Sequence, residues 1–227
     1  MIPKNVRYTL GRLRGNVLQN FNRLRSVEAI FTSIYNNHRW GDEESVSGTG
    51  SKIEQTKGIA AFMPLLFRKY DIRNVLDIPC GDFNWMQHVD LSTINYVGAD
   101  IVPALINKNT LSYAAPHVNF FLADIIKDRL PKVDLVFCRD CFVHFSDKHI
   151  STAIENIKLS GAEFILTTTF PRHSNFDIIT GNWRALNLQI KPFYFPQPLE
   201  LFNEGFHPEK TGIADKSLGL WRVSDLP

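Results

Sequence analysis

The chain alternates between short runs of apolar residues and longer stretches in which apolar residues recur at helical spacing. The short runs have the length and composition of strands that are buried on both faces. Five of them follow one another over residues 74–78, 95–100, 118–124, 133–138 and 163–169. The stretches between them predict helices over residues 84–91, 102–113 and 147–159. Apolar strands that alternate with helices are typical of a parallel, doubly wound sheet.

The last part of the chain breaks this alternation. Residues 198–203 and 217–223 read as two strands with no convincing helix between them. Without a crossover helix, two such strands are expected to pair antiparallel. The predicted fold class is therefore α/β, with a Rossmann-like, mostly parallel sheet of seven strands that closes with an antiparallel C-terminal hairpin.

Three segments precede the first strand. Residues 1–27 carry Lys4 and five arginines but no acid, and their apolar residues recur at near-helical spacing. This pattern predicts a basic amphipathic helix, which either packs on its own domain or makes a peripheral contact with an anionic membrane or a partner. Residues 40–51 are polar and rich in Gly and Ser, which predicts a loop. Residues 53–70 predict a helix, with Ser51 as its N-cap and Glu54 completing a capping box.

Length and composition fit one α/β domain. The chain has 227 residues, of which 44% are apolar, so we expect a single domain over 1–227 with 1–52 as an N-terminal helical and lid extension. The net charge of +2 does not indicate nucleic acid as a partner. No apolar run approaches the length of a transmembrane segment.

The chain has three cysteines, Cys80, Cys138 and Cys141. So small and odd a number does not make a disulfide framework and favours a reducing, cytoplasmic location. Cys138 and Cys141 also have the spacing of a metal or redox pair. Without a second Cys or His pair nearby, buried structural thiols are the better interpretation.

Acidic residues close three consecutive predicted strands, at Asp77, Asp100 and Asp124. In open α/β sheets, ligands bind beyond the carboxyl ends of the strands. Gly81 follows the first strand and would let the backbone approach a ligand. Asp100 lies 23 residues beyond Asp77, where a carboxylate can accept both hydroxyls of a ribose. Asp124 could instead cap the turn that follows it.

Two segments resemble class I S-adenosylmethionine (SAM)-dependent methyltransferases. Asp77-Ile-Pro-Cys-Gly-Asp82 resembles motif I of that family, with Pro79 and Phe83 in two positions that usually hold glycine. Residues 134–145, Asp-Leu-Val-Phe-Cys-Arg-Asp-Cys-Phe-Val-His-Phe, resemble motif IV and the segment after it. With the antiparallel tail, the resemblance covers roughly residues 74–227. It implies the class I methyltransferase fold and SAM as cofactor.

The resemblance also implies a cofactor site. Asp77 would reach the ammonium group of the methionine part, Asp100 would hold the ribose, and Asp124 would accept from the adenine amino group. Ile101 would pack on the adenine. The other expected cofactor residues are Pro79, Cys80, Gly81, Trp85, Ile125 and Arg139.

Further segments are similar to one subfamily of small methyltransferases that includes glycan-modifying enzymes. They are Ser47–Ser51 with Gln55-Thr56, Thr167–Pro171, Asn182–Asn187 and Asp215–Trp221. This similarity implies O-methylation of a sugar hydroxyl, with a glycan or sugar precursor as acceptor. The expected substrate and lid residues are Trp40, Ser47, Gly48, Gly50, Ser51, Gln55, Trp183 and Arg184. The glycines of residues 47–51 would permit a lid to close, although an ordinary linker is the simpler alternative.

A sugar hydroxyl is a weak nucleophile, so a base has to remove its proton. Asp140, His144 and His173 follow the fourth and fifth strands and are the candidates. His144 lies four residues after Asp140, so one helical turn would let the aspartate orient the imidazole. Each has a structural alternative: His144 satisfies backbone groups, Asp140 caps a helix or pairs with Arg139, and His173 is an exposed loop residue.

Other functions stay open at this stage. The acceptor could be a small-molecule amine, a protein or an RNA, and the chain could be a non-catalytic SAM-binding module. An NAD-dependent Rossmann protein is disfavoured by the missing GxGxxG and by the C-terminal hairpin. No acid–His cluster has the spacing of metal ligands, so we predict metal-independent transfer.

Overall fold

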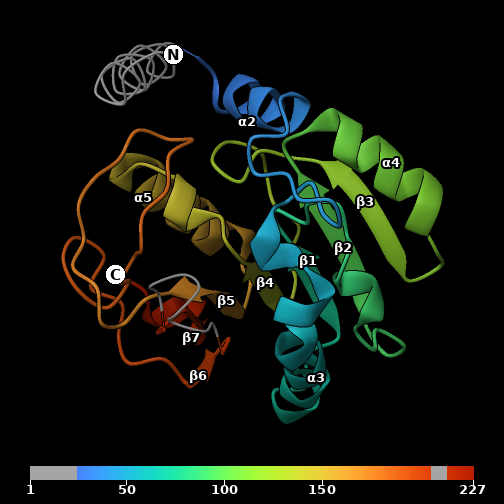
Figure 1. Ribbon diagram of the computed structural model, residues 1–227. Helices are drawn as coiled ribbons and strands as arrows, with labels where there is room; N and C mark the ends of the chain where they lie inside the picture. The colour runs from blue at the N-terminus through green and yellow to red at the C-terminus, as the bar shows by residue number, and fades with distance from the viewer. Residues whose placement is uncertain (1–24, 206–213) are drawn as a thin grey trace, which may run out of the picture.

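The computed structural model describes residues 25–205 and 214–227, and within them the chain forms one sheet of seven strands (Figure 1). The strand order is β3-β2-β1-β4-β5-β7-β6. Their bounds are β1 Asn74–Asp77, β2 Asn95–Asp100, β3 Val118–Leu122, β4 Leu135–Cys138, β5 Phe164–Thr169, β6 Glu200–Asn203 and β7 Ser217–Arg222. The first five strands pair parallel, and β7 pairs antiparallel with both β5 and β6. The predicted fold class is confirmed, including its antiparallel C-terminal hairpin.

Alternate residues of the central strands face two different cores, as the two-residue period of a strand requires. Leu76, Val136 and Ile165 belong to the core that the inner face of α5 (Asp147–Ser160) completes. Their neighbours Val75 and Leu135 belong to a second core. Helix α3 (Ile53–Lys69) completes that second core with its buried residues Ile59, Met63, Leu66 and Phe67. Helix α4 (Pro103–Tyr113) contacts β2 and β3.

The predicted helix over 84–91 is wrong. The structure has only a short 3-10 turn there, Met86–His88, and Phe83 before it has φ of 58°. Phe83, Trp85, Met86 and Val89 are all buried in the second core. The positive φ of Phe83 interrupts a helical backbone at the start of this segment, and the packing of the four apolar side chains fixes its course instead.

The predicted cap of α3 is also wrong. Lys52 occupies the N-cap position and its side chain makes no capping hydrogen bond. The carboxylate of Glu44 accepts from the Ile53 N–H at 2.6 Å instead. The first turn of α3 is therefore capped from the preceding loop, by a residue nine positions away.

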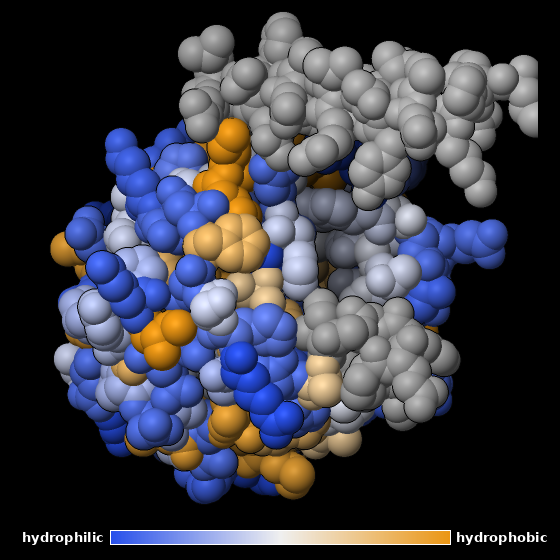
Figure 2. Space-filling view, turned by 60° about the vertical axis from the view of Figure 1, so that its left-hand side comes forward, coloured by the Kyte–Doolittle hydropathy of each residue, from blue (hydrophilic) through white to orange (hydrophobic). Residues whose placement is uncertain are grey.

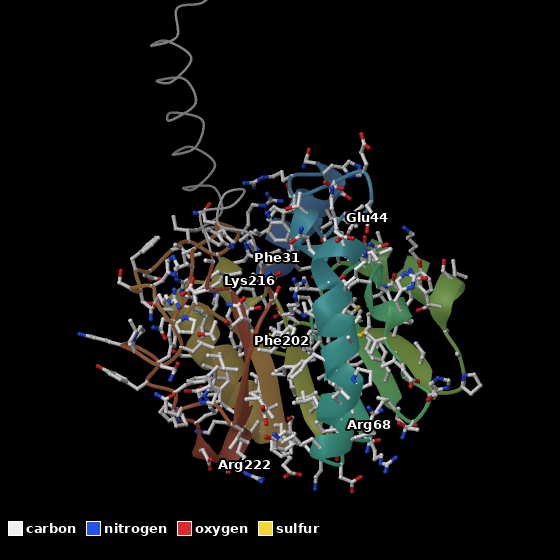
Figure 3. The ribbon with its side chains drawn as sticks, turned by 60° about the horizontal axis from the view of Figure 1, so that its bottom comes forward. Phe31, Glu44, Arg68, Phe202, Lys216 and Arg222 are labelled. Atoms are coloured by element: carbon white, nitrogen blue, oxygen red, sulfur yellow. The ribbon has the colours of Figure 1, made fainter. Side chains whose placement is uncertain are left out.

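Helix α2 (Val27–Asn36) and the loop after it lie at the top of the molecule in Figure 1, above the central strands. Figure 3 shows Phe31, Glu44 and Lys216 at the same end of the molecule, whereas Arg68 and Arg222 lie at the opposite end. The first end is where the parallel strands finish. The predicted basic helix over 1–27 lies, for all but its last residues, outside the described part of the chain.

The face shown in Figure 2 carries its hydrophobic side chains in separate small groups among hydrophilic ones. In the ranges 25–205 and 214–227, none of the helices combines the length and the apolar character that crossing a lipid bilayer demands.

Candidate active site

A pocket opens at the carboxyl ends of β1, β2, β3 and β4, where the strand order switches between β1 and β4. This is the position at which open α/β sheets bind their ligands. Helix α2 and residues 40–51, the loop named the lid from here on, close it from above. The pocket holds about 1130 Å³ of space between atoms, part of it open to solvent.

The turn after β1 forms the floor of the pocket. The carboxylate of Asp77 accepts a 2.5 Å hydrogen bond from the hydroxyl of Tyr96. Burial raises the pKa of Asp77 to about 8, although the Tyr96 hydrogen bond opposes the rise. Gly81 has φ of 56°, a conformation that favours glycine. The side-chain amide of Asn109 in α4 donates to the Gly81 carbonyl at 2.8 Å and so holds the turn from below.

Asp100 joins the ends of β1 and β2. Its carboxylate accepts from the Gly81 N–H at 3.1 Å and from the Val102 N–H at 2.9 Å. Burial raises the pKa of Asp100 to about 6, and these backbone hydrogen bonds hold it from rising further. Asp100 therefore positions the glycine turn as well as facing the pocket.

Asp124, after β3, lines the pocket beside Ile125. Its carboxylate accepts from the Ile126 N–H at 2.9 Å and lies 3.6 Å from Lys127 Nζ. Asp124 therefore caps the following turn, as the structural alternative predicted, and also lines the pocket. One carboxylate can do both because each of its oxygens has two lone pairs.

The lining holds more acidic than basic side chains. Among the described residues that line the pocket, the formally charged groups are five aspartates and one arginine. The aspartates are Asp77, Asp82, Asp100, Asp124 and Asp140, and the arginine is Arg139. Such a lining suits a ligand that carries positive charge together with one anionic group.

The lid is fastened to the β1 turn by Asp82, whose carboxylate is buried. It accepts from the Ser45 hydroxyl at 2.9 Å, the Val46 N–H at 2.9 Å and the Ser47 hydroxyl at 3.4 Å. The Ser47 hydroxyl also lies where a side chain on Gly81 would begin. Ser47 of the lid therefore packs directly on the backbone of Gly81, where any side chain would collide with it.

Two further residues, Asn84 and Arg139, hold the lid. The side-chain amide of Asn84 donates to Glu44 at 3.0 Å and to the Ser51 carbonyl at 3.2 Å. Arg139 Nη2 donates to the Gly50 carbonyl at 2.8 Å. The lid is consequently tied both to the β1 turn and to the end of β4.

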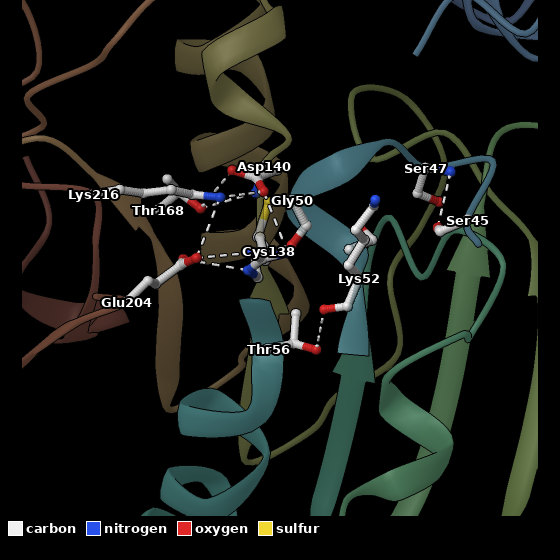
Figure 4. Close-up of polar contacts among 12 residues, drawn as sticks. Ser45, Ser47, Gly50, Lys52, Thr56, Cys138, Asp140, Thr168, Glu204 and Lys216 are labelled. Carbon is white, nitrogen blue, oxygen red and sulfur yellow. Dashed lines mark hydrogen bonds and ion pairs between the residues drawn. The ribbon is translucent and has the colours of Figure 1, made fainter. Parts of the chain in front are cut away.

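Four charged residues meet at the end of β4, as Figure 4 shows for three of them. Arg139 Nη2 lies 2.7 Å from Glu204, which follows β6. Lys216, which precedes β7, lies 2.6 Å from Asp140 and 3.3 Å from Glu204. Arg139 Nη1 lies 3.3 Å from Asp140. These four side chains are called the charged cluster below.

The charged cluster keeps Asp140 ionised. Burial by itself would raise the pKa of Asp140, but Lys216 and Arg139 hold it well below its usual range. Asp140 also has φ of 54° and donates its N–H to the Thr168 hydroxyl at 2.9 Å. A non-glycine residue in that conformation marks a backbone that its surroundings hold in place, often at a functional site.

His144 lines the same half of the pocket. Its Nδ1 lies 2.8 Å from the Asn182 carbonyl, so Nδ1 carries the proton and Nε2 is left as the acceptor nitrogen. The Trp40 ring stacks on the imidazole with centroids 4.2 Å apart. Burial lowers the pKa of His144 to about 4, against the Asn182 hydrogen bond and the negative charge of Asp140, which raise it.

The expected orientation of His144 by Asp140 is wrong. Asp140 points to Lys216 and Arg139, and the backbone carbonyl of Asn182 fixes the imidazole. The short turn Phe142–His144 is a 3-10 helix, so a spacing of four residues does not bring the two side chains together as one α-helical turn would.

All ten expected cofactor residues line the pocket, as do Asp140, His144, Trp40, Ser47 and Ser51. Six other candidates do not. His173 pairs with Asp215 at 3.2 Å, and Trp183 stands edge-on to Phe170, 47% exposed. Gly50 lies close to Asp140 and Lys216, Gly48 packs against the backbone of Trp40, and Gln55 is half-buried in the first turn of α3.

Arg184, expected as a substrate residue, is buried and bound within the protein. It donates to the Phe145 carbonyl at 2.6 Å and to Asp147 at 2.7 Å. These contacts fasten residues 182–184 to the start of α5. Arg184 therefore has a structural role and does not line the pocket.

Helix α2 contributes to the pocket, which was not predicted from the sequence. Val27, Phe31, Ile34 and Tyr35 line the pocket. Val27, Phe31 and Ile34 recur at the spacing of one helical face, and Ser26 before them is the N-cap that accepts from Ala29. This N-cap and the apolar spacing after it could have predicted a helix over residues 27–36. Asp82 was also missed as a lid anchor, because its role depends on a loop far away in the sequence.

Comparison with known proteins agrees with this geometry. Residues 75–159 match the model of a methyltransferase domain. No curated protein sequence matches the chain.

Several solved methyltransferase structures have a similar fold. Magnesium protoporphyrin IX methyltransferase from Synechocystis PCC 6803, solved with bound SAM, is 12% identical, with a TM-score of 0.57 over 87% of this chain and 97% of that one. The N-methyltransferase NodS from Bradyrhizobium japonicum WM9 is 14% identical, with a TM-score of 0.55 over 75% of this chain and 96% of that one. Human N-acetylserotonin methyltransferase in complex with SAM is 14% identical, with a TM-score of 0.52 over 87% of this chain and 60% of that one.

The fold is that of class I SAM-dependent methyltransferases. Residues 75–159, which hold most of the pocket floor and His144, match the methyltransferase-domain model, and two of the solved structures with this fold contain SAM.

Proposed function

We propose that this protein transfers the methyl group of SAM to a hydroxyl of a sugar, in a glycan or a sugar precursor, with His144 as the base. The observation that carries the proposal is the orientation of His144. Its Nδ1 is engaged by the Asn182 carbonyl, so Nε2 is the nitrogen that can accept a proton in the pocket.

The residues present fit the cofactor. SAM carries a sulfonium and an ammonium group, and the ionised aspartates of the lining complement them. Asp77 and the Gly81 turn would hold the methionine part, Asp100 the ribose, and Asp124 with Ile101 and Ile125 the adenine. Arg139 would hold the carboxylate. When bound, SAM supplies a methyl group that is already activated for displacement.

The chain's own residues then have to position the acceptor and accept its proton. His144 is neutral near pH 7, since burial lowers its pKa to about 4. The hydroxyl proton would pass to Nε2 as the new C–O bond forms, and Asp140, ionised by Lys216 and Arg139, would stabilise the resulting imidazolium. The aromatic rings of Phe31 and Trp40 suit the flat face of a sugar ring.

The remaining expectations belong to the same proposal. Residues 1–227 would form one domain, with 1–52 as an extension that supplies α2 and the lid. Nucleic acid would not be a partner. A reducing, cytoplasmic location is supported by Cys80, Cys138 and Cys141, which are buried free thiols.

The test is a panel of acceptors with the full chain and SAM. The panel contains free sugars, nucleoside-diphosphate sugars, a phenol, a polyamine and an RNA oligonucleotide, and mass spectrometry measures S-adenosylhomocysteine and the methylated product. A methyl ether on a sugar is the expected result. Methylation of the amine or RNA alone overturns the acceptor, and SAM binding without turnover on any acceptor would instead indicate a binding module.

A further inference from the structure

Three rings from separate segments are packed in a row over the end of β4. Phe31 of α2 lies 5.7 Å from Trp40 of the lid, centroid to centroid, and Trp40 lies 4.2 Å from His144. The planes of Trp40 and His144 differ by only 28°, so the indole covers one face of the imidazole. The Asn182 carbonyl holds the edge of the same ring. His144 is therefore fixed from its face and from its edge.

The lid carries a specific support for Trp40. Gly48 has φ of 94°, and a Cβ there would lie 2.8 Å from the Trp40 carbonyl oxygen. Both the conformation and the close approach require glycine. The anchors of the lid on Asp82 and Arg139 thus hold Gly48, and with it Trp40, over His144.

The charges that face His144 come from the elements under it. Asp140 favours the protonated imidazole, whereas Lys216 and Arg184 oppose it. On the other side, α2 and the lid present Phe31 and Trp40, which carry no charge. The aromatic cover therefore acts on His144 by excluding water and not by adding a charge.

We propose that Trp40 is a positioning residue that completes the catalytic base: stacked on His144, it keeps water from the imidazole and holds Nε2 toward the pocket only while the lid is closed. The proposal rests on the proposed function for the role of His144, but its structural part does not. Lid closure and assembly of the base then become one event, so methyl transfer is confined to the closed pocket.

The test follows the protonation of His144 by NMR of the full chain, with the imidazole signals assigned through His144→Gln. In the wild type, we expect His144 to stay neutral down to pH 5. In Trp40→Ala, we expect at least a tenfold rise in its proton affinity, because water reaches the ring. Trp40→Phe retains a stacked ring and should titrate like the wild type. Phe176→Ala, which removes an aromatic ring that is 62% exposed, is the matched control and should also leave His144 unchanged.

Gly48→Ala provides an independent variant in which Trp40 itself is retained. Displacement of the lid backbone should raise the proton affinity of His144 in the same direction, by a smaller factor. If His144 titrates alike in the wild type, Trp40→Ala and Gly48→Ala, the positioning role is overturned. If Trp40→Ala shifts the titration of His144 but His144→Ala transfers methyl groups at the wild-type rate, Trp40 does shield the imidazole, and His144 is not the base.

Discussion

The half of the pocket at the ends of β1, β2 and β3 and the half at the end of β4 differ in where their residues come from. In the first half, Asp77 and Asp100 end their strands and Asp124 follows β3 by two residues, and backbone N–H groups hold Asp100 and Asp124. In the second half, Trp40, His144, Asn182, Glu204 and Lys216 come from five separate segments. The first half depends on the local strand-to-turn geometry, whereas the second exists only once the whole chain has folded. Substitutions in the two halves should accordingly affect different steps.

The largest expected effect lies in the second half. His144→Ala should lower turnover by about 10²–10⁴-fold, which is the usual contribution of a positioned base. SAM affinity should stay within a factor of about two, because the residues assigned to SAM lie elsewhere in the pocket. Turnover is measured as S-adenosylhomocysteine formation on the acceptor found in the panel, and affinity by calorimetry. Lost thermal stability together with lost SAM binding would assign His144 a structural role instead.

Asp100→Ala should have the opposite signature. Loss of a charged hydrogen-bonding group should weaken SAM binding by about 1–3 kcal/mol, or roughly 5–150-fold. The variant also removes an acceptor for the Gly81 N–H, so the turn itself loses support. At saturating SAM, turnover should approach the wild-type value. Calorimetry that finds unchanged SAM affinity would contradict the cofactor assignment.

Asp77→Asn should separate stability from binding. Burial raises the pKa of Asp77 to about 8, so between about pH 4 and 8 the folded chain keeps a proton that the unfolded chain releases. Stability is therefore lost as pH rises through this range. The neutral asparagine avoids that loss, so the stability of the SAM-free variant relative to the wild type should rise between pH 5 and pH 8, by at most about 4 kcal/mol because each of these three pH units is worth about 1.4 kcal/mol. Denaturant titrations at pH 5 and pH 8 test this, since the difference in unfolding free energy between the variant and the wild type should be smaller at pH 5. The variant should bind SAM more weakly than the wild type at both pH values.

The smallest expected effect is that of a chelator. No group of three or more His, Cys, Asp or Glu among residues 25–205 and 214–227 is arranged to hold a metal ion. Both SAM binding and turnover should therefore be unchanged in the presence of EDTA. Loss of turnover that magnesium restores would show that a metal takes part.

The same contrast explains what could be predicted from the sequence. The strands follow from the apolar runs, whereas the expected cofactor residues were implied by the resemblance to methyltransferases, and all of them line the pocket. The charged cluster could not be predicted, because Glu204 directly follows β6, Lys216 directly precedes β7, and the two meet Arg139 and Asp140, respectively, only through sheet pairing. His144 was found, but its partner was not, since a backbone carbonyl leaves no trace in residue identity.

The five aspartates of the lining have a consequence for how the reaction ends. Methyl transfer removes the positive charge of the sulfonium, so the product S-adenosylhomocysteine occupies the same negative surroundings with one favourable Coulomb interaction fewer. A pocket with this lining would therefore distinguish SAM from S-adenosylhomocysteine by their charge. Product inhibition should be weak for that reason, and it should strengthen relative to SAM binding as salt screens the carboxylates.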